Sequence, residues 1–370
     1  MAGPYAYSLF KEEKHLSFVG NFCNELLVDS NFLFIYAGFV NQNFLTLNTK
    51  ELDYLRKTLK HSVKENTRVI FDCSGEGICK PLLEVLHKIV DDNLDPSNVY
   101  YITSASNVME IYERMSVKNR IHIRSIGVWE SFMNDHLQYP KSYTVKEKEK
   151  VCICFNRVAR PHRLALFGLM LERGLVEKSY YSYLHASHNS DNPLESYLKA
   201  IKSQFSDSSY KRVEKQIRLN KDKIPLMLNI PPDENATYIK DSDYDYFENS
   251  YFSLVTETLY NERDGSVFFS EKIFKPIGMK HPFILVNAPG SLKYLRDLGY
   301  RTFNNIIDET YDTINNPEER MLAIVAEVER LSKNTPEQWI DWQNQAKEIV
   351  EHNYRTLKSK TFKDFIYARS

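Results

Sequence analysis

The stretch Ser270-Glu271-Lys272-Ile273-Phe274-Lys275-Pro276-Ile277-Gly278-Met279 comes shortly before the apolar run Pro282-Phe283-Ile284-Leu285-Val286. Ser270 has the side chain of a helix N-cap, and the charged residues Glu271 and Lys272 fall in the first helical turn. The two apolar residues that follow them turn inward, so the charged pair faces whatever lies beyond the helix N-terminus. The stretch therefore predicts a short helix followed by a buried strand.

A helix N-terminus of this kind is a natural anion site. Its free backbone N–H groups and the positive end of the helix dipole attract a phosphate. Lys272 can add a point charge, and Glu271 can accept hydrogen bonds from the hydroxyls of a sugar. Ser270, Glu271 and Lys272 are thus candidates to bind a nucleotide. The same order of residues also occurs at ordinary surface helices, so the rest of the chain has to decide.

Length and composition predict two domains and leave the partner open. Single hydrophobic cores stop growing near about 250–300 residues, and this chain has 370 residues, 48 of them basic and 49 acidic. Near-neutral charge gives no global attraction to nucleic acid, although it permits a local basic groove. The sequence has no run of 18 or more apolar residues and no N-terminal apolar segment with a basic flank. We therefore expect a protein without a membrane span, located in the cytoplasm.

The cysteines predict reduced, buried thiols. They are odd in number, and several lie in apolar runs, which disfavours both disulfides and a zinc site. They are Cys23, Cys73, Cys79, Cys152 and Cys154.

The first half of the chain alternates strand and helix patterns. Apolar, β-rich runs cover residues 31–39, 68–72, 99–102 and 121–126, and helical spacing covers residues 52–63, 81–89 and 108–115. Such alternation predicts a parallel sheet covered by helices. Ligands of these sheets bind beyond the carboxyl ends of the strands, which makes the loop from Asp72 to Gly77 a candidate site.

A charged stretch marks the expected boundary between the domains. Residues 135–150 break the alternation and end in a run of five charged residues. We expect a first domain over residues 1–145, a second over 146–335, and a terminal helix pattern over 336–370. Its apolar stripe suits a helix that returns toward the first domain, and it equally suits a helix packed on its own domain. A new strand over 151–155 is followed by Arg157 and a helix carrying Arg163 in its first turns. Guanidinium forks bind phosphate oxygens in pairs, although Arg157 also fits an ordinary surface position.

Two possible metal motifs are disfavoured. Asp241 and Asp243 form an Asp-x-Asp, but a metal-binding motif of that type should close an apolar strand, and this one precedes such a strand among polar loop residues. His185 and His188 lack a third partner nearby. We therefore expect no metal.

The residues before the opening stretch carry a family resemblance. Thr256-Glu257-Thr258 follows an apolar strand, and Phe268-Phe269 leads into the Ser-Glu-Lys helix and the Pro-Phe-Ile-Leu-Val run. This order resembles the donor-binding core of the α1,3-fucosyltransferase-like family of glycosyltransferases, in its phage or bacterial type. Phe155-Asn156-Arg157 and Arg163-Leu164-Ala165-Leu166-Phe167 are similar to the arginine-bearing segment of that family. The resemblance covers about residues 151–298 and does not extend to the N-terminal domain.

The resemblance implies a GT-B fold, with two facing Rossmann-like α/β domains and a C-terminal helix crossing back. It implies a nucleoside-diphosphate sugar as donor, no further cofactor, a ribose contact for Glu271, and diphosphate contacts for Lys272 and Arg163. Glu257 and Thr258 belong to the turn beside the nucleotide base. The family has an aromatic-Glu-Asn turn there, so the identity of the base stays open.

The expected activity is therefore metal-independent, inverting transfer of a sugar to an acceptor hydroxyl, with a saccharide as acceptor. One alternative is a phage DNA glycosyltransferase that acts on hydroxymethylated bases, and another is a non-catalytic nucleotide- or glycan-binding module. The general base should be a carboxylate on a strand-end loop of the first domain. Glu76 lies between two glycines that let the loop turn sharply, and Asp72 and then Glu130 are further candidates. Asp72 also fits a turn in which its carboxylate only accepts backbone N–H groups.

Overall fold

The computed structural model describes residues 32–36, 67–75, 77, 80–137, 142–186, 193–224, 226, 228, 241–261 and 265–369. The chain forms two compact units, in agreement with the expected two domains. Unit 1 consists of residues 1–135, 262–269 and 360–370, and unit 2 consists of residues 136–261 and 270–359. We describe each unit by itself.

The boundary between Asp135 and His136 comes earlier than the one expected after residue 145. The charged stretch over residues 146–150 is held against unit 2 by side chains far along the sequence. The Lys146 ammonium lies 3.1 Å from the Glu248 carboxylate. The Gln343 amide also exchanges hydrogen bonds with the backbone of Lys146, at 2.8 and 3.3 Å. The run of charges predicted a solvated linker. The run itself could not predict that Lys146 would contact Glu248 and Gln343, because these partners lie about 100 and 200 residues later in the chain.

Unit 1 is built on a five-stranded sheet with the order β1-β2-β3-β4-β9. The strands are β1 (Phe32–Tyr36), β2 (Arg68–Cys73), β3 (Val99–Thr103), β4 (His122–Ile126) and β9 (Ile366–Arg369). Strands β1 to β4 pair in parallel, and β9 pairs antiparallel with β4. The parallel part confirms the strands expected from the alternating pattern. The strand β9 was not expected, because four residues at the end of the chain carry little periodicity.

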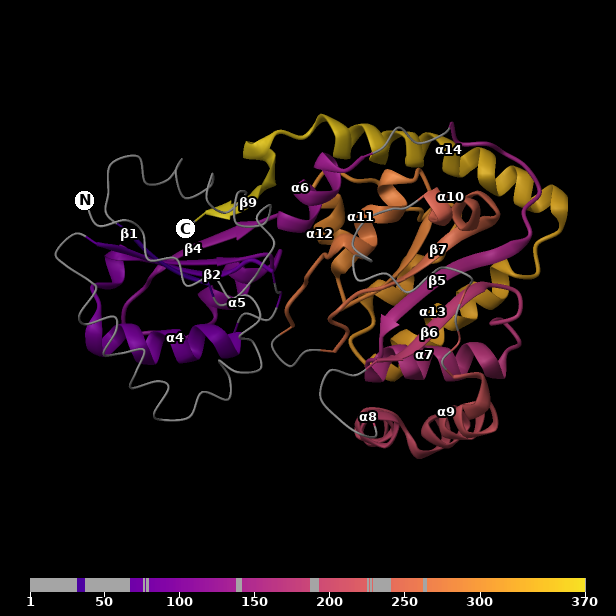
Figure 1. Ribbon diagram of the computed structural model, residues 1–370, viewed down its shortest axis with the longest axis horizontal. Coiled ribbons are helices and arrows are strands. Elements are labelled where there is room, and N and C mark those ends of the chain that lie inside the picture. Colours follow the sequence, from indigo (N-terminus) through magenta and orange to yellow (C-terminus); the bar gives the residue numbers. More distant parts are fainter. Residues whose placement is uncertain are drawn as a thin grey trace. The chain divides into compact units, whose positions relative to one another are not determined.

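Helices α4 (Lys80–Asn93), α5 (Val108–Glu113) and α6 (Val128–Asp135) belong to the same unit. Figure 1 shows α4 running along one face of the sheet. Its apolar side places Leu83, Leu86 and Val90 in one buried cluster with side chains of β2 and β3. This is the helix-on-sheet packing that the sequence predicts. The helix expected over residues 52–63 lies outside the described residues.

A short segment from the middle of the chain completes unit 1. The Asn107 side chain donates to Gly265 O and accepts from Val267 N, both at 2.8 Å. Phe268 pairs with Ala105 in an isolated antiparallel bridge. A Cβ atom added at Gly77 would lie 2.1 Å from the Cβ of Phe268, so this close approach requires glycine.

The C-terminal tail is held to unit 1 by a buried carboxylate. Glu130 on α6 is fully buried, and its two oxygens accept from Lys360 Nζ at 2.5 Å and from the Tyr367 hydroxyl at 2.7 Å. Both partners belong to the last segment of the chain. The tail is therefore an integral part of this unit's core.

Unit 2 has a four-stranded parallel sheet with the order β6-β5-β7-β8. The strands are β5 (Lys150–Val158), β6 (Tyr180–Ala186), β7 (Ser250–Thr256) and β8 (Phe283–Val286). The first strand, β5, is central. The chain proceeds to β6 on one side of it and then crosses to β7 on the other, so the strand order reverses between β5 and β7. Open α/β sheets bind ligands at such a reversal, beyond the carboxyl ends of the strands.

Eight α-helices of unit 2 are described: α7 (Pro161–Glu172), α8 (Pro193–Lys202), α9 (Asp207–Leu219), α10 (Asp241–Glu248), α11 (Glu271–Gly278), α12 (Ser291–Asp297), α13 (Pro317–Leu331) and α14 (Pro336–Ser359). Short 3-10 turns are η1 (Pro96–Asn98) in unit 1, η2 (Lys221–Lys223) and η3 (Glu309–Thr313) in unit 2, and η4 (Phe362–Phe365) in the tail. Figure 1 shows α11 and α14 above the sheet and α7 and α13 below it, so both faces are covered.

The long helix α14 confirms the pattern that begins at residue 336. The Trp339 ring stacks on Tyr251 with 3.8 Å between the ring centroids, and the Trp342 indole donates to Ile306 O at 3.2 Å. Both contacts lie within unit 2, and only the tail after Ser359 belongs to unit 1. The terminal segment expected over 336–370 is thus divided between the two units.

Three of the five cysteines are described, namely Cys73, Cys152 and Cys154, and each is a free, buried thiol as expected. Cys23 and Cys79 lie outside the described residues. Among the helices that the structure describes, none combines the length and the apolar character needed to cross a membrane.

Candidate functional site

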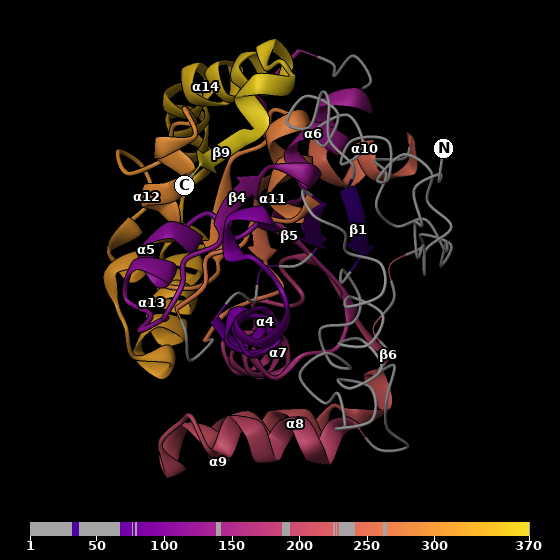
Figure 2. The same cartoon turned by 90° about the vertical axis from the view of Figure 1, so that its left-hand side faces the viewer.

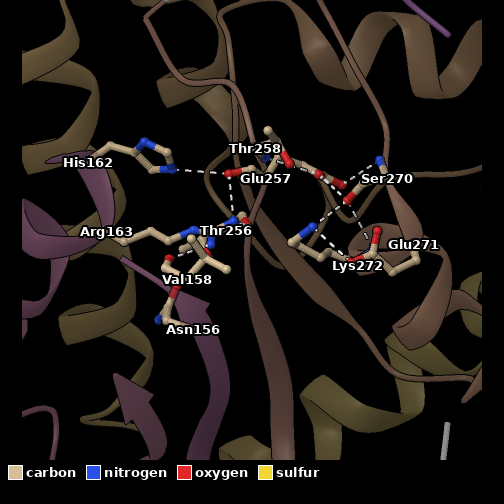
Figure 3. A network of polar contacts seen from close by, with 10 residues as sticks. All are labelled: Asn156, Val158, His162, Arg163, Thr256, Glu257, Thr258, Ser270, Glu271 and Lys272. Atoms are coloured by element: carbon tan, nitrogen blue, oxygen red, sulfur yellow. Dashed lines mark hydrogen bonds and ion pairs between the residues drawn. The ribbon is translucent and has the colours of Figure 1, made fainter. Parts of the chain in front are cut away.

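The opening stretch of the sequence lies at the strand-order reversal of unit 2. Strands β5 and β7 are parallel neighbours, so their carboxyl ends lie at the same edge of the sheet. The helix α11 begins at Glu271, after the loop that follows β7. Figure 3 shows side chains from both strand ends and from the start of α11 converging in one polar network. Seven of the residues expected to bind the donor belong to this region.

Ser270 is the N-cap of α11, as predicted. Its backbone is extended, and its hydroxyl accepts a hydrogen bond from Lys272 N at 3.3 Å. The same hydroxyl donates to Glu257 Oε2 at 2.6 Å, and Ser270 N donates to Glu257 Oε1 at 3.1 Å. The cap of α11 is thereby joined to the residue that follows β7.

Glu257 is fully buried, and its carboxylate also accepts from Thr258 N at 3.3 Å. Burial raises the pKa of the Glu257 carboxyl, while the Lys272 charge and the bonds from Ser270 act against the rise. The sequence placed Glu257 and Thr258 beside the nucleotide base. The described hydrogen bonds of the Glu257 carboxylate hold the loop between β7 and α11.

Glu271 and Lys272 form an ion pair at the edge of the site. Their charged groups are 2.9 Å apart, and the side chains are 17% and 27% exposed. Burial acts to raise the pKa of Glu271, but Lys272 and Lys275 outweigh it and lower the pKa to about 2. The Lys272 ammonium also donates to the Ser270 hydroxyl at 2.9 Å. A cation that is partly exposed at a helix N-terminus, and that needs only a side-chain rotation to leave Glu271, is chemically suited to a phosphate.

Arg163 differs from its expected role. It is only 2% exposed, and its guanidinium donates to Val158 O at 2.8 Å, to Thr256 O at 3.0 Å and to Glu257 O at 3.1 Å (Figure 3). Burial, together with the nearby Arg160 charge, lowers the pKa of Arg163 to about 10. The guanidinium of Arg163 therefore links the backbone at the end of β5 to the backbone at the end of β7. A diphosphate contact would require it to give up these carbonyl oxygens.

Three neighbours of this network were not singled out from the sequence. The His162 Nε2 lies 3.0 Å from Glu257 O, and its ring stacks on Tyr260. Burial lowers the pKa of His162 well below its usual value, and Arg163 and Arg160 add to the effect, so the ring is neutral and donates through Nε2. Thr256 Oγ1 donates to Asn156 Oδ1 at 2.6 Å across the two central strands. For Asn156 and Thr256, the signal available in the sequence was their position near the ends of two predicted strands.

Arg157 remains accessible. It is the second-to-last residue of strand β5, and its side chain is exposed. It is therefore the arginine of this region whose position suits a dissolved anion.

The candidate bases belong to unit 1. Asp72 lies in β2, is fully buried and accepts from Ser74 N at 2.9 Å, which is the turn geometry that was its alternative explanation. Glu76 lies outside the described residues. The Glu130 carboxylate is bound by Lys360 and Tyr367 as described above, which leaves it poorly suited to proton transfer.

Within the part of the chain that the structure describes, no group of three or more His, Cys, Asp or Glu side chains is placed to hold a metal ion. Asp241 and Asp243 begin α10 rather than lying in a loop as expected, and their side chains are not among those described. The His185 side chain and the whole of His188 also lie outside the described part.

Comparison with known proteins adds no name. No protein-family model matches the chain, and no curated protein matches it at a significant level.

Proposed function

We propose that this protein is a glycosyltransferase that takes a sugar from a nucleoside-diphosphate sugar and transfers it to an acceptor hydroxyl. The two units correspond in this proposal to the two domains of a GT-B enzyme, with unit 2 as the donor domain and a saccharide as the acceptor. The transfer is inverting and independent of metal.

The single observation that supports the proposal most is the position of the α11 N-terminus. It follows β7 at the strand-order reversal of a parallel sheet, where α/β proteins bind nucleotides. The partly exposed Lys272 lies at this N-terminus, and Arg157 extends from the neighbouring strand β5. A diphosphate contacted by these two cations and by the helix N-terminus explains why the charges gather at this edge.

The chemistry requires little beyond such a site. A carboxylate accepts the proton of the acceptor hydroxyl, the oxygen forms a bond to the anomeric carbon, and the bond from that carbon to the diphosphate oxygen breaks. The departing diphosphate carries the developing negative charge, which Lys272 stabilises. We assign the proton transfer to Glu76 and the orientation of the phosphate-binding loop to Arg163, through the carbonyl oxygens that it holds.

A screen of UDP-, GDP- and CDP-sugars for hydrolysis, followed by calorimetric titration with the best nucleoside diphosphate, tests the proposal. Lys272→Met should weaken binding at least tenfold, because a hydrogen bond from a charged group contributes about 1.5–3 kcal/mol. Lys293→Met is the matched control, since Lys293 lies on α12 of the same unit and forms an exposed pair with Asp297. Equal affinity in wild type and Lys272→Met, or no binding of any nucleotide, would refute the donor site.

Transfer is then measured to oligosaccharides and to hydroxymethylated DNA, each with and without a chelator of divalent ions. Glu76→Gln should bind the nucleotide sugar normally and transfer it about 10²–10⁴ times more slowly. Activity that is lost in chelator and restored by manganese or magnesium would contradict the metal-independent mechanism. Binding without hydrolysis or transfer would favour a non-catalytic module.

A further inference from the structure

Helices α8 and α9 form a hairpin on the outer side of unit 2. Figure 1 shows the two helices side by side, and in both Figure 1 and Figure 2 α7 lies between them and the sheet. Their inward side chains, among them Ile201, Val213 and Ile217, are buried. The approach to α7 is close, because a Cβ atom added at Gly168 would lie 2.9 Å from Val213 Cγ1. The hairpin is therefore a well-packed platform whose other face meets solvent.

Two of the four acidic side chains of this hairpin, Glu195 and Glu214, are paired with arginine. Both branches of the Arg212 guanidinium lie 2.7 Å from the Glu172 carboxylate on α7. Arg218 pairs with Glu195 at 2.9 Å and with Glu214 at 2.8 Å. These two arginines pair with three glutamates, two of them within the hairpin, and the remaining basic residues of the hairpin are lysines.

The lysines of this segment lack ion-pair partners among the described residues. Residues 193–223 contain eight basic and four acidic residues, in a chain whose net charge is −1. Within residues 193–223, all of which the structure describes, five exposed lysines have no described ion pair or hydrogen-bond acceptor for their side chains, and a sixth, Lys202, lies over the Tyr210 ring at 5.5 Å. The five are Lys199, Lys211, Lys215, Lys221 and Lys223. Asp207 and Asp222 are the acidic residues of the segment outside the pairs above.

The spacing of the cations follows the helix. Lys211 and Lys215 are four residues apart on α9, so they form one row with a step of about 6 Å. The row ends beside Leu219, which is 68% exposed and is the one exposed large apolar side chain of the described residues. A helix that lies on a membrane needs an apolar face of several such residues. A row of cations with a single apolar neighbour is better matched to a polymer of phosphates.

We propose that the outward face of α8, α9 and η2, called here the lysine face, binds the phosphate backbone of a nucleic acid without reading its sequence. The surface has the features of backbone recognition, which are clustered lysines, twice as many basic as acidic residues, and a rigid support. The inference does not depend on sugar transfer. If transfer to DNA occurs, the lysine face is where the acceptor polymer is retained; if it does not, the binding stands alone.

The test is fluorescence anisotropy with a labelled single-stranded oligonucleotide and with the corresponding duplex, at several salt concentrations. Wild type should bind at low salt, and its affinity should fall linearly on a logarithmic plot against salt. The double variant Lys211→Glu/Lys215→Glu should weaken binding at least tenfold and reduce the salt slope by about 2, one for each lost phosphate contact.

The matched control is Lys178→Glu/Lys347→Glu, which makes the same charge change at two exposed lysines of unit 2 away from the hairpin. It should bind almost as wild type. Circular dichroism of every variant confirms folding, and hydrolysis of the nucleotide sugar should be unchanged in the hairpin variant, which separates this inference from the proposed function. No binding at low salt, an equal loss in the control, or tighter binding to phosphatidylserine vesicles or a sulfated polysaccharide than to nucleic acid would overturn the proposal.

Discussion

Replacing Arg163 by alanine should destabilise unit 2 severely. The change removes a buried cation that donates to the carbonyl oxygens of Val158, Thr256 and Glu257 at 2.8 to 3.1 Å. The Glu257 oxygen keeps the His162 ring as a donor, but all three oxygens lose the guanidinium. A hydrogen bond from a charged group contributes about 1.5–3 kcal/mol, but removing the guanidinium also removes the cost of burying it. A buried acceptor left unsatisfied costs about 1–3 kcal/mol, so we expect a net loss of about 3–5 kcal/mol from these carbonyl oxygens together.

Urea unfolding followed by tryptophan fluorescence measures this loss, because Trp339 and Trp342 are buried in α14 of the same unit. With a denaturant dependence of about 1–3 kcal/mol per molar urea, the midpoint should fall by more than about 1 M. Arg163→Lys keeps the charge but not the fork, so its midpoint should lie between those of wild type and Arg163→Ala. The control Arg157→Ala alters an exposed arginine on β5 and should change stability by less than about 0.5 kcal/mol.

The same variants separate a structural function from a ligand contact. If Arg163→Ala unfolds at the wild-type midpoint yet loses affinity for a nucleoside diphosphate, the guanidinium must exchange its carbonyl partners for phosphate, and the reasoning from the observed hydrogen bonds is refuted. A parallel loss of stability and affinity, with partial recovery of both in Arg163→Lys, is the expected result.

Three other predictions concern groups away from this network. Burial raises the pKa of Asp312 to about 6. The stability of unit 2 should therefore fall by up to about 3 kcal/mol as the pH rises from about 4 through about 6. Urea titrations at each pH measure this fall, and Asp312→Asn should remove it. Gly77→Ala places a methyl group against Phe268 and should cost about 1–3 kcal/mol; adding Phe268→Ala should then cost less than it does alone, and simple additivity in a double-mutant cycle would contradict the contact. Lys360→Met leaves the buried Glu130 carboxylate without its cation and should destabilise unit 1 by about 3–5 kcal/mol. The double variant Lys360→Met/Glu130→Gln should recover part of this loss. Equal melting temperatures of the single and the double variant would refute the pairing.

The sequence predicted the strands whose signal is local. Residues 68–73, 99–103 and 250–256 carry continuous apolar, β-rich runs, and each forms a buried strand of a parallel sheet. The helix from Pro336 has a full stripe of apolar residues and was equally readable. Strand β6 was not, because its repeated tyrosines lie in a polar context, and β9 is only four residues long.

The candidate site was predictable in location and less so in function. Ser270 follows a local rule for helix caps, and the structure places it at the N-terminus of α11 as expected. The side-chain partners of Arg163 depend on where β7 lies beside β5, almost a hundred residues away in the chain. Sequence spacing identifies a cation near a strand end. Only the pairing of the strands shows that backbone carbonyl oxygens accept the hydrogen bonds of this cation.

The four places where the chain changes unit have a consequence for synthesis. A ribosome delivers β1 to β4 early, yet the strand that covers the edge of β4 consists of residues 366–369, and Phe268 reaches Gly77 only after more than half the chain has been made. During that interval the β4 edge offers unpaired N–H and C=O groups, which other chains can pair with. The core of unit 2 ends at Ser359, so it can be complete while the older half of the protein still waits for its last strand. Aggregation of nascent chains, and dependence on a chaperone, should therefore originate in the N-terminal half.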